Sequence, residues 1–507
     1  MTESLQIDPP DEFNQQLVNQ VHPPGWINPQ PERRYNLVVI GAGTAGLVTA
    51  AGAAGLGAKV ALIERHLMGG DCLNTGCVPS KAIIRSARAM HAVMQSNELG
   101  IQIATGSVAV NFPQVMERMR KLRADISTHD SAQRFKDLGV DVFIGDASFL
   151  NRSTIQVDQR QLEFKKAVIA TGARAAVPEI EGLEETGFLT NETIFSLTQL
   201  PLRLAILGAG PIGCELAQAF ARFGSEVTLI QSRTQILPRE DRDAAQIIQR
   251  QLEQDGVKIL LNAASTQIAR TAAGKTIQID LQGKQSEIIV DEILISTGRA
   301  PNVQGLNLEQ AGVKYDEREG VFVNNYLQTT NSAIYAAGDI CSRYQFTHTA
   351  DFQARIVIGN ALFKGRSKSS NLLIPWCTYT EPEIAHVGLY EHEAAAKNIR
   401  IQTFIQELKD VDRAILDAET NGFVKIHVKQ GSDKILGATI VASHAGDLIS
   451  EISVAMQSGM GLKKLASVIH PYPTQADAIR KIGDQYNRTR LSPLVKSIFN
   501  KWLTWSR

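Results

Sequence analysis

The chain has 507 residues, of which 44% are hydrophobic and 21% charged, and its 52 basic side chains balance 52 acidic ones. One hydrophobic core does not normally extend over such a length, so several domains are expected. The charge balance argues against a nucleic-acid surface and favours small-molecule partners. Five cysteines are too few for a secreted disulfide framework, which indicates a reducing, cytoplasmic setting.

Residues 1–34 form a polar, proline-rich segment that we expect to be an N-terminal arm. Its start lacks the basic residues and apolar core of a signal peptide, so export is not expected. The following stretch, 37–58, is uncharged and long enough to cross a bilayer. Six glycines interrupt it, however, and their order fits a strand, a turn and a helix better than one membrane helix.

Residues 35–66 have the pattern of a dinucleotide-binding unit, with GxGxxG directly after a β-branched strand. Gly41 permits the tight turn, Gly43 lets the backbone approach a pyrophosphate at the helix N-terminus, and Gly46 allows close packing of helix and strand. The second strand ends at Glu64, whose carboxylate can accept hydrogen bonds from ribose hydroxyls. A single match of this kind is weak evidence.

The segment 201–233 repeats the whole pattern, with Gly208, Gly210 and Gly213 in the same order. Chance glycines in ordinary strand-to-helix turns can explain one match. Two matches that both keep the flanking strands and helix are hard to obtain by chance. The sequence therefore predicts two dinucleotide sites in one chain.

The two units differ at the end of their second strands. The position that holds Glu64 in the first unit holds Gln231 in the second. A carboxylate there binds a ribose 2′-hydroxyl but repels a 2′-phosphate, whereas neutral Gln231 followed by Arg233 suits the phosphate. We therefore predict NADPH rather than NADH at the second site, although Arg233 can also be read as a solvated loop arginine.

The loop GGDCLNTGCVPSK, residues 69–81, holds Cys72 and Cys77. No second CxxC and no paired histidines accompany it, so a zinc site is weakly supported. A buried structural pair would not need three glycines. The N-terminus of the helix that follows, together with Lys81, can stabilise a thiolate. Cys72 and Cys77 are therefore predicted to cycle between dithiol and disulfide.

From residue 35 to about 483, the chain resembles the FAD-dependent pyridine nucleotide-disulfide oxidoreductases, and the cysteine loop is among the most specific motifs of that family. Further similar motifs are ATG at 170–172, STGRAPN at 296–302, AAGDI at 336–340 and HPYPTQAD at 470–477. The resemblance implies an α/β fold with two Rossmann-like domains, for FAD and NADPH, and a C-terminal α+β dimerisation domain.

The implied domain order places the NADPH domain inside the FAD domain. The predicted ranges are 1–34 for the arm, 35–182 and 301–365 for the FAD domain, 183–300 for the NAD(P)H domain, 366–483 for the interface domain and 484–507 for a C-terminal amphipathic helix. Members of the family dimerise through the interface domain. The resemblance thus implies a homodimer in which each active site borrows residues from the partner.

Residue roles can be carried over from the family motif by motif. Cys77 would lie against the flavin as the charge-transfer thiolate, and Cys72 would exchange with substrate. Lys81 would pair with Glu215 beside the flavin N5. The residues expected to bind FAD are Gly41, Gly43, Gly46, Glu64, Gly70, Thr171, Gly172, Asp339 and Thr347. Those expected to bind NADPH are Gly208, Gly210, Gly213, Gln231 and Arg233.

The last segment, LSPLVKSIFNKWLTWSR, predicts a well-segregated amphipathic helix. One half of its helical wheel carries the apolar residues Leu494, Val495, Ile498, Phe499, Trp502, Leu503 and Trp505. The other half carries the cations Lys496, Lys501 and Arg507. Docking on the dimer surface and peripheral contact with a membrane both explain this pattern, because tryptophan and lysine at such positions also suit a membrane surface.

The resemblance fails at one catalytic position. Disulfide reductases of the family usually have a histidine directly before a proline and five residues before an acid. Here Tyr472 takes that position, Asp477 is the acid, and His470 lies two residues earlier. An unperturbed tyrosine gives up its proton too reluctantly to cycle as a base near neutral pH. The sequence does not decide whether His470 or Tyr472 takes part in proton transfer.

The mercuric reductase branch shares this tyrosine, and a departing metal ion needs no proton. Its C-terminal cysteine pair and N-terminal metal-binding domain have no counterpart in this sequence. The leading hypothesis is an NADPH-dependent flavoprotein that reduces a thiophilic acceptor, Hg(II) above all, with Cys72 and Cys77 as transient ligands of this substrate metal. The alternatives are a reductase for lipoamide, glutathione disulfide or quinones, and a flavin-bearing redox sensor.

Overall fold

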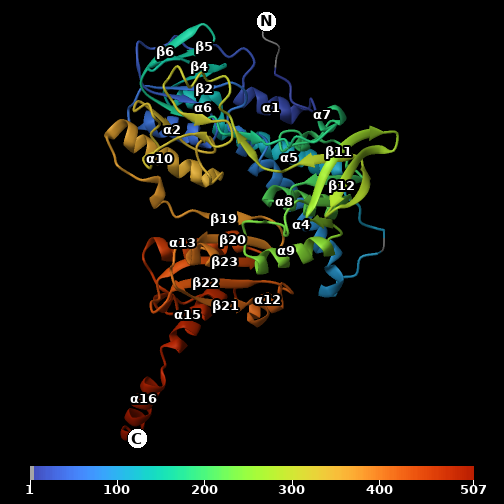
Figure 1. Ribbon diagram of the computed structural model, residues 1–507, viewed down its shortest axis with the longest axis vertical. Coiled ribbons are helices and arrows are strands. Elements are labelled where there is room, and N and C mark those ends of the chain that lie inside the picture. The colour runs from blue at the N-terminus through green and yellow to red at the C-terminus, as the bar shows by residue number, and fades with distance from the viewer. Residues whose placement is uncertain (1–4, 105) are drawn as a thin grey trace. The chain divides into compact units, whose positions relative to one another are not determined.

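The computed structural model describes residues 5–104 and 106–507, and it divides into two compact units. The first unit comprises Met1–Ser232 and Gly256–Leu372, and the second comprises Arg233–Asp255 and Leu373–Arg507. Figure 1 shows the ribbon coloured along the chain. Among the residues described, no helix has both the length and the apolar character needed to cross a bilayer.

A seven-stranded sheet lies at the centre of the first nucleotide-binding fold, in the order β3-β2-β1-β6-β5-β4, with β18 paired to β6. The contacts among β1, β2, β3, β6 and β18 are parallel, and β4 and β5 extend the sheet in antiparallel fashion. The strands are β1 Tyr35–Ile40, β2 Val60–Glu64, β3 Val140–Ile144, β4 Ala147–Asn151, β5 Thr154–Val157, β6 Arg160–Ile169 and β18 Ile334–Ala336.

Strand β1 is apolar along almost its whole length because both of its faces are buried. Leu37 and Val39 belong to one hydrophobic cluster, which includes residues of helices α2 (Thr44–Gly55) and α10 (Thr347–Phe363). Val38 and Ile40 belong to a second cluster on the other face. Helices α2 and α10 pack against each other over the first face. The turn after β1 is thereby held at the edge of a rigid layer.

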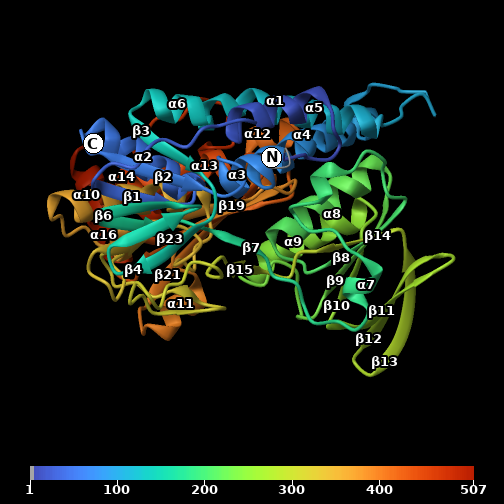
Figure 2. The ribbon, with the colours of Figure 1, turned by 90° about the horizontal axis from the view of Figure 1, so that it is seen from above.

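A four-stranded parallel sheet in the order β10-β9-β8-β14 forms the second nucleotide-binding fold. Its strands are β8 Arg203–Leu207, β9 Glu226–Gln231, β10 Lys258–Leu261 and β14 Glu292–Ile295, and helix α8 (Pro211–Phe223) follows β8. Figure 2 shows these strands with the long antiparallel sheet beside them. That sheet contains β11 Ala263–Thr271, β12 Gly274–Leu281 and β13 Lys284–Val290.

Short elements complete the first unit. Two-stranded pairs are β7 Ala173–Ala175 with β15 Arg299–Pro301, and β16 Tyr315–Asp316 with β17 Gly320–Val321. The remaining helices are α1 Glu12–Val21, α3 Gly70–Asn74, α4 Cys77–Met94, α5 Phe112–Ser127, α6 Ala132–Asp137 and α7 Leu183–Thr186. Helix α4 packs against both α5 and α8, so the helix that begins at Cys77 connects the two nucleotide-binding folds.

The N-terminal arm contains a helix that the sequence analysis did not predict. Asp11 caps α1 by accepting a hydrogen bond from the Asn14 backbone, and the helix buries its own residues Leu17 and Val21. After the helix, Trp26 Nε1 donates to the Val142 carbonyl at 3.1 Å. Asn28 exchanges hydrogen bonds with the Ile144 backbone at 2.8 and 2.7 Å. The arm therefore covers the exposed edge of β3, where unpaired backbone groups would otherwise face solvent.

The second unit is built around a five-stranded antiparallel sheet in the order β19-β20-β23-β22-β21. Its strands are β19 Pro375–Thr378, β20 Glu383–Gly388, β21 Ile401–Glu407, β22 Phe423–Lys429 and β23 Ile435–Ala442. Its helices are α9 Arg242–Gln254, α11 Glu391–Ala396, α12 Asp412–Leu416, α13 Ala445–Gln457, α14 Leu462–Leu465, α15 Asp477–Thr489 and α16 Pro493–Trp505. Two Rossmann-like sheets and this mixed domain confirm the predicted α/β fold class.

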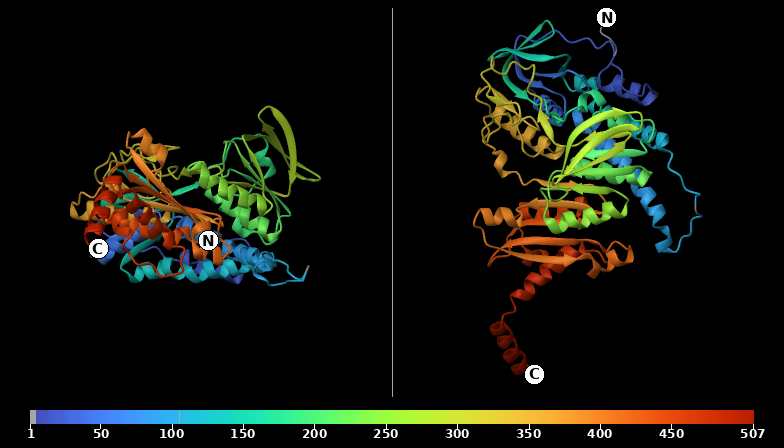
Figure 3. Two further views of the ribbon diagram at one scale, coloured as in Figure 1. Left: turned by 90° about the horizontal axis from the view of Figure 1, so that it is seen from below. Right: turned by 45° about the vertical axis from the view of Figure 1, so that its right-hand side comes forward.

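The C-terminal helix begins later than the predicted residue 484. Residues 484–489 belong to α15, and α16 starts at Pro493. Ser492 caps α16 by accepting a hydrogen bond from Val495 N at 3.3 Å, and proline occupies the first helical turn. A serine cap followed by proline is a strong local start signal, which explains the break. In Figure 3, α16 extends away from the five-stranded sheet of its unit.

Candidate functional site

The two glycine-rich turns have the same backbone geometry. Gly41 and Gly208 follow β1 and β8 with φ of +98° and +103°. A Cβ on Gly41 would lie 2.4 Å from the Ala170 carbonyl oxygen, and one on Gly208 would lie 2.5 Å from the Ser296 carbonyl oxygen. Both turns therefore require glycine for its left-handed conformation and for space.

The later glycines open the N-terminus of each helix. Gly43 and Gly210 are the N-caps of α2 and α8, with nearly identical extended conformations. No atom lies within 4 Å of a Cβ placed on Gly210, and only Gly70 Cα lies near one on Gly43, at 3.7 Å. Each helix thus presents backbone N–H groups to open space, which is the geometry that binds a pyrophosphate. The residues present fit two dinucleotides.

The two nucleotide-binding folds differ at the end of their second strands, as the sequence comparison indicated. Glu64 accepts hydrogen bonds from the backbone N–H groups of Ala42 at 2.7 Å and His66 at 2.9 Å. Burial raises the pKa of the Glu64 carboxyl, and these two donors oppose the shift. Gln231 ends β9 in the corresponding place and is buried.

The residues after Gln231 include more cations than the sequence analysis singled out. In the second unit, Arg233, Arg239 and Arg242 line a surface hollow of about 350 Å³, together with His392. Two acids also border it. Glu240 accepts hydrogen bonds from Tyr390 Oη at 2.6 Å and Trp376 Nε1 at 2.9 Å, and Asp241 pairs with Lys425 at 2.9 Å. With both carboxylates bound, the arginines give the hollow the character of an anion site.

Gly70, Thr171 and Gly172 are predicted to bind FAD, and the two glycines have a left-handed backbone conformation. Gly70 has φ +57°, and a Cβ there would lie 2.6 Å from Gly43 Cα. Thr171 donates from its hydroxyl to the Asn302 carbonyl at 2.9 Å, and Asn302 Nδ2 returns a bond to the Thr171 carbonyl at 2.9 Å. Gly172 has φ +66°, and no atom lies within 4 Å of a Cβ placed on it. These residues leave room for a bound group beside β1.

Asp339 and Thr347 come from later segments of the same unit. Burial raises the pKa of the Asp339 carboxyl to about 6, and the nearby Arg299 guanidinium, 3.5 Å away, opposes the shift. Thr347 is the first residue of α10, and two residues on, the buried Thr349 hydroxyl has no hydrogen-bond partner among the described residues. An unsatisfied buried hydroxyl is costly, so this end of α10 fits a bound polar cofactor.

The redox-active loop is braced by one carboxylate. Asp71 Oδ1 accepts hydrogen bonds from Thr75 Oγ1 at 2.9 Å and Asn191 Nδ2 at 2.8 Å, and Arg299 Nη1 lies 3.3 Å from Oδ2. A Cβ on Gly76 would lie 2.8 Å from the Asp71 carbonyl oxygen, so the loop closes only over glycine. None of these bracing residues was predicted, because each contact joins segments far apart in the sequence.

The structure holds Cys72 and Cys77 as thiols with different acidities. Cys77 is the first residue of α4, and its Sγ lies 3.5 Å from Thr347 Oγ1. The hydrogen bond from Cys72 lowers the pKa of the Cys77 thiol to about 6, with smaller contributions from Thr347 and the charge of Lys81. The same hydrogen bond raises the pKa of the Cys72 thiol. The thiolate is therefore favoured on Cys77, where the helix dipole also stabilises it.

Lys81 and Glu215 meet as the family motif implies. Lys81 lies one turn after Cys77 on α4, and its Nζ is 2.7 Å from Glu215 Oε2 on α8. Glu215 is buried. This ion pair joins the helix that carries Cys77 to the helix after the second glycine turn, and it leaves a cation within one helical turn of the low-pKa sulfur.

The three residues of the C-terminal motif have separate partners. His470 Nε2 lies 2.8 Å from Glu451 Oε1, and its Nδ1 lies 3.1 Å from the Val468 carbonyl oxygen. Tyr472, 75% exposed, donates to Asp412 Oδ2 at 2.9 Å. That hydrogen bond raises the pKa of Tyr472.

Asp477, which the family pattern would make the orienting acid, pairs with Arg480 at 2.8 Å. Glu451 and Asp412 were not predicted as partners for His470 and Tyr472, since no local motif includes them.

No group of three or more histidine, cysteine or acidic side chains in the described part of the chain has a metal-binding arrangement. Cys72 and Cys77 together offer two soft sulfur atoms, which is enough to hold a thiophilic metal ion in transit as a substrate.

Comparison with known proteins gives two family matches, to the pyridine nucleotide-disulphide oxidoreductases over residues 35–354 and to their dimerisation domain over residues 374–482. Mercuric reductase of Staphylococcus aureus is 36% identical over 447 residues, which cover 88% of this chain and 81% of the relative. Dihydrolipoyl dehydrogenase of Mycoplasma pneumoniae is 33% identical over 456 residues, which cover 88% and 97%.

The chain is also similar to a solved structure of the HOCl-induced flavoprotein disulfide reductase RclA from Escherichia coli. The TM-score is 0.79 at 30% identity, and the match covers 89% of this chain and 99% of that one. A further structure of the same protein is its Cu(II) complex. Relatives with metal and with disulfide acceptors therefore share this fold.

We predict that the reduced holoenzyme gains the ultraviolet absorbance of one thiolate as the pH rises through about 6. Below that pH Cys77 is protonated. Cys72→Ala should move the step to higher pH because it removes the hydrogen bond that stabilises the thiolate, and Lys81→Gln should move it in the same direction by removing a positive charge. Difference titration of wild type and variants measures the midpoints. A step that persists in Cys77→Ser would assign the thiolate to another residue.

Proposed function

Because the chain belongs to the pyridine nucleotide-disulphide oxidoreductases, a family of FAD- and NAD(P)H-dependent enzymes, we propose that it is an NADPH-dependent reductase whose oxidant is the thiophilic metal ion Hg(II). The observation that carries this proposal is Tyr472. It stands where a disulfide reductase of the family has its acid-base histidine, and its hydrogen bond to Asp412 raises its pKa further. Such a group does not exchange protons readily near neutral pH.

The two candidate reactions differ in their proton balance. Bound FAD supplies two-electron transfer between the nicotinamide and the dithiol. Reduction of a disulfide converts NADPH, a proton and the disulfide into NADP⁺ and two thiols, so the site must deliver a proton to a leaving thiolate. Reduction of a bis-thiolate complex of Hg(II) converts NADPH and the complex into NADP⁺, Hg(0), two thiolates and a proton. The free thiolates take up protons in solvent, so the site itself delivers none to the departing metal. A site with an exposed tyrosine in place of the histidine suits the second balance.

The dithiol has the properties that a soft metal ion requires. Cys77 carries a thiolate near pH 6 and above, and Cys72 supplies a second sulfur from the preceding helix. Two thiolate ligands suit Hg(II), which prefers soft sulfur donors. Among the relatives, the S. aureus protein is named a mercuric reductase, and RclA has been solved with Cu(II). Both names support a thiophilic metal as the oxidant here.

A second candidate is a disulfide reductase that uses His470. The contact between its Nε2 and Glu451 Oε1, at 2.8 Å, is an imidazole–carboxylate pair of the kind that orients a general base. The name of RclA as a disulfide reductase and that of the dihydrolipoyl dehydrogenase relative favour this reading. His470 and Tyr472 are therefore the residues whose substitution separates the two functions.

The dimerisation domain supports formation of a homodimer, and we propose that each active site is completed by the partner. In the second unit, Ile469 is 95% exposed, and Val454 and Tyr472 are also exposed. Large apolar side chains at such exposure mark an interaction surface. They lie on α13 and on the segment that contains His470, so a partner that covers them would also contact the proposed proton-transfer residues.

We further propose that the enzyme works in the cytoplasm and contacts an anionic membrane surface through α16. Six large apolar side chains of this helix, two of them tryptophans, are 52–79% exposed. From residue 485 to 507 the chain has five cations and no acidic residue, which complements anionic lipid headgroups. Thirteen residues extend about 20 Å as a helix, too short to span the bilayer, so the helix would lie in the interface plane.

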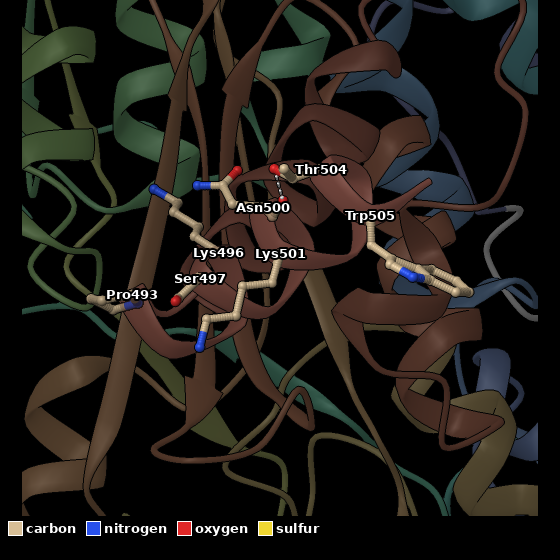
Figure 4. Close-up of a pocket in the computed structure, with 7 residues that line it drawn as sticks. All are labelled: Pro493, Lys496, Ser497, Asn500, Lys501, Thr504 and Trp505. Atoms are coloured by element: carbon tan, nitrogen blue, oxygen red, sulfur yellow. Dashed lines mark hydrogen bonds between the residues drawn. The ribbon is translucent and has the colours of Figure 1, made fainter. Parts of the chain in front are cut away.

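The two lysines of α16 are placed for this orientation. Lys496 and Lys501 project from the polar side, beside Ser497, Asn500 and Thr504, where they border a shallow surface hollow (Figure 4). Thr504 Oγ1 donates to the Asn500 carbonyl at 2.7 Å, so this hydroxyl is satisfied within the helix. The apolar side chains are exposed, and lipid acyl chains would cover them while the lysines reach the headgroups.

The acceptor prediction compares Hg(II), presented as a bis-thiolate complex, with glutathione disulfide and lipoamide. Wild type should oxidise NADPH with Hg(II) at least about a hundredfold faster than with either disulfide, since general acid-base help is absent. Tyr472→His should raise disulfide reduction without raising Hg(II) reduction, and Tyr472→Phe should leave Hg(II) reduction intact. Rapid reduction of a disulfide by wild type, abolished in His470→Ala, would instead establish the disulfide reductase.

The nucleotide prediction concerns Gln231 and Arg233. Arg233→Ala should weaken NADP⁺ binding by about tenfold or more, the size expected for a charge-assisted hydrogen bond, and should leave NAD⁺ binding unchanged. Gln231→Glu should act in the same direction through repulsion. Calorimetric titration of the oxidised holoenzyme measures both affinities, with Arg250→Ala as the control arginine on α9. An equal loss of affinity for NADP⁺ and NAD⁺ would show that Arg233 does not recognise the 2′-phosphate.

The membrane prediction uses vesicles of phosphatidylcholine with and without phosphatidylglycerol. Full-length holoenzyme should co-sediment with the anionic vesicles and be released by salt. A Lys496→Glu/Lys501→Glu double variant and Trp502→Ala should each lose this binding, whereas Ser497→Ala should keep it. Flavin content and NADPH oxidation should not change. If truncation at residue 490 splits the dimer in size-exclusion chromatography and vesicle binding is absent from wild type, α16 is a dimer contact.

A further inference from the structure

The N-terminal arm reaches the redox-active loop through a buried arginine. Arg123 on α5 is 4% exposed, and Asn14 on α1 is 2% exposed. Arg123 Nη2 donates to Asn14 Oδ1 at 2.6 Å, and Arg123 Nη1 donates to the Asn74 carbonyl oxygen at 2.7 Å. One guanidinium therefore joins the arm to the last residue of α3, the short helix that carries Cys72.

Asn74 is in turn fixed to the start of its own loop. Its side-chain Nδ2 donates to the Met68 carbonyl at 3.1 Å and to the Gly70 carbonyl at 2.8 Å. Its side chain thus closes the segment 68–74, while its main-chain carbonyl is held by Arg123. Because Cys77 follows three residues after Asn74, this anchor lies between the two sulfur-bearing positions.

The arm also holds the residues that precede the loop. Met68 N donates to the Val21 carbonyl at 3.1 Å, and the His22 ring contacts the His66 carbonyl oxygen. The segment 66–74 is therefore attached to the arm at its beginning by backbone contacts and at its end through Arg123. The arm lies outside the match to the family, which begins at residue 35, so the family model does not include these attachments.

The arm supplies what the buried cations of α5 need. Arg120 and Arg123 lie one turn apart, and burial lowers the pKa of Arg123 to about 10, with the charge of Arg120 adding to the shift. Asp11 of the arm pairs with Arg120, and Asn14 gives Arg123 a neutral acceptor. A buried guanidinium without such acceptors pays a large desolvation cost. Removal of the Asn14 contact is therefore expected to weaken the hydrogen bond from Arg123 to the Asn74 carbonyl oxygen.

We propose that Asn14 is a positioning residue for the Cys72–Cys77 pair, acting through Arg123 and the Asn74 carbonyl. Held by this chain of contacts, α3 keeps the Cys72 thiol in place to donate its hydrogen bond to Cys77. When the chain is broken, α3 samples other positions, and the two sulfur atoms lie within bonding reach of each other for a smaller fraction of the time. The arm thus tunes the reactivity of the redox pair.

The test measures the equilibrium between the dithiol and the Cys72–Cys77 disulfide in holoenzyme, set by exchange with buffers of glutathione and glutathione disulfide, together with FAD content and the melting temperature. Asn14→Ala should shift this equilibrium about threefold to tenfold toward the dithiol, because the effective concentration of one sulfur beside the other falls by the equivalent of one net hydrogen bond. Asn14→Asp keeps an acceptor for Arg123 and should restore the wild-type equilibrium. The matched control is Asn19→Ala, on the exposed side of the same helix, which should change nothing.

The inference rests on the redox role proposed for Cys72 and Cys77, and the two fail differently. A wild-type enzyme that forms no disulfide in these buffers would overturn the dithiol assignment. A wild-type disulfide whose equilibrium is unchanged in Asn14→Ala, even with a lower melting temperature, would show that the arm is only structural. If Asn14→Ala does not fold, Asp11→Asn decides, because Asp11 is partly exposed and is expected to give a smaller shift in the same direction.

Discussion

The site depends on the close approach of two backbones, at Gly43 and Gly70. A Cβ on Gly70 would lie 2.6 Å from Gly43 Cα, so the redox-active loop can reach the first nucleotide turn only because Gly70 has no side chain. Gly43 caps α2, whose N-terminus is suited to a pyrophosphate, and Gly70 begins the helix that carries Cys72. One steric constraint therefore sets both the place of the first dinucleotide and the place of the reactive sulfur.

Segments far apart in the sequence then meet at one carboxylate. Asp71 contacts Asn191 and Arg299, and Arg299 in turn lies near Asp339. The AAGDI and STGRAPN motifs are thus tied to the cysteine loop by side chains and not only by a shared ligand. This brace matters chemically because the hydrogen bond between the two thiols is the largest cause of the difference between their pKa values. A loop that could shift by an ångström would lose it, and the charge would no longer be confined to Cys77.

Sequence analysis could predict those parts of the site whose geometry depends on a local or repeated sequence pattern. Glycine spacing predicted both turns because their geometry forbids any side chain, and the family motif predicted the contact between Lys81 and Glu215. It was insufficient where a contact joins distant segments. The Asp71 brace, the Arg123 anchor and the partner of His470 each need the tertiary fold, since periodicity reports which face of an element is buried and not which polar group it meets. Helix α1 was missed because its polar composition resembles a linker.

The acidity of Cys72 bears directly on the choice between metal and disulfide. Its raised pKa means that it enters the reaction as a thiol and must lose a proton before it forms a bond. A thiophilic metal provides for this itself, because coordination to the cation deprotonates the thiol, and the displaced ligand thiolate can take the proton. A disulfide has no such effect on an approaching thiol, so it needs a base beside Cys72. Tyr472 is poorly suited to be that base, so under the second candidate function His470 would take this role. Under the proposed reduction of Hg(II), the raised pKa of Cys72 is no obstacle, because coordination to the metal itself removes the thiol proton.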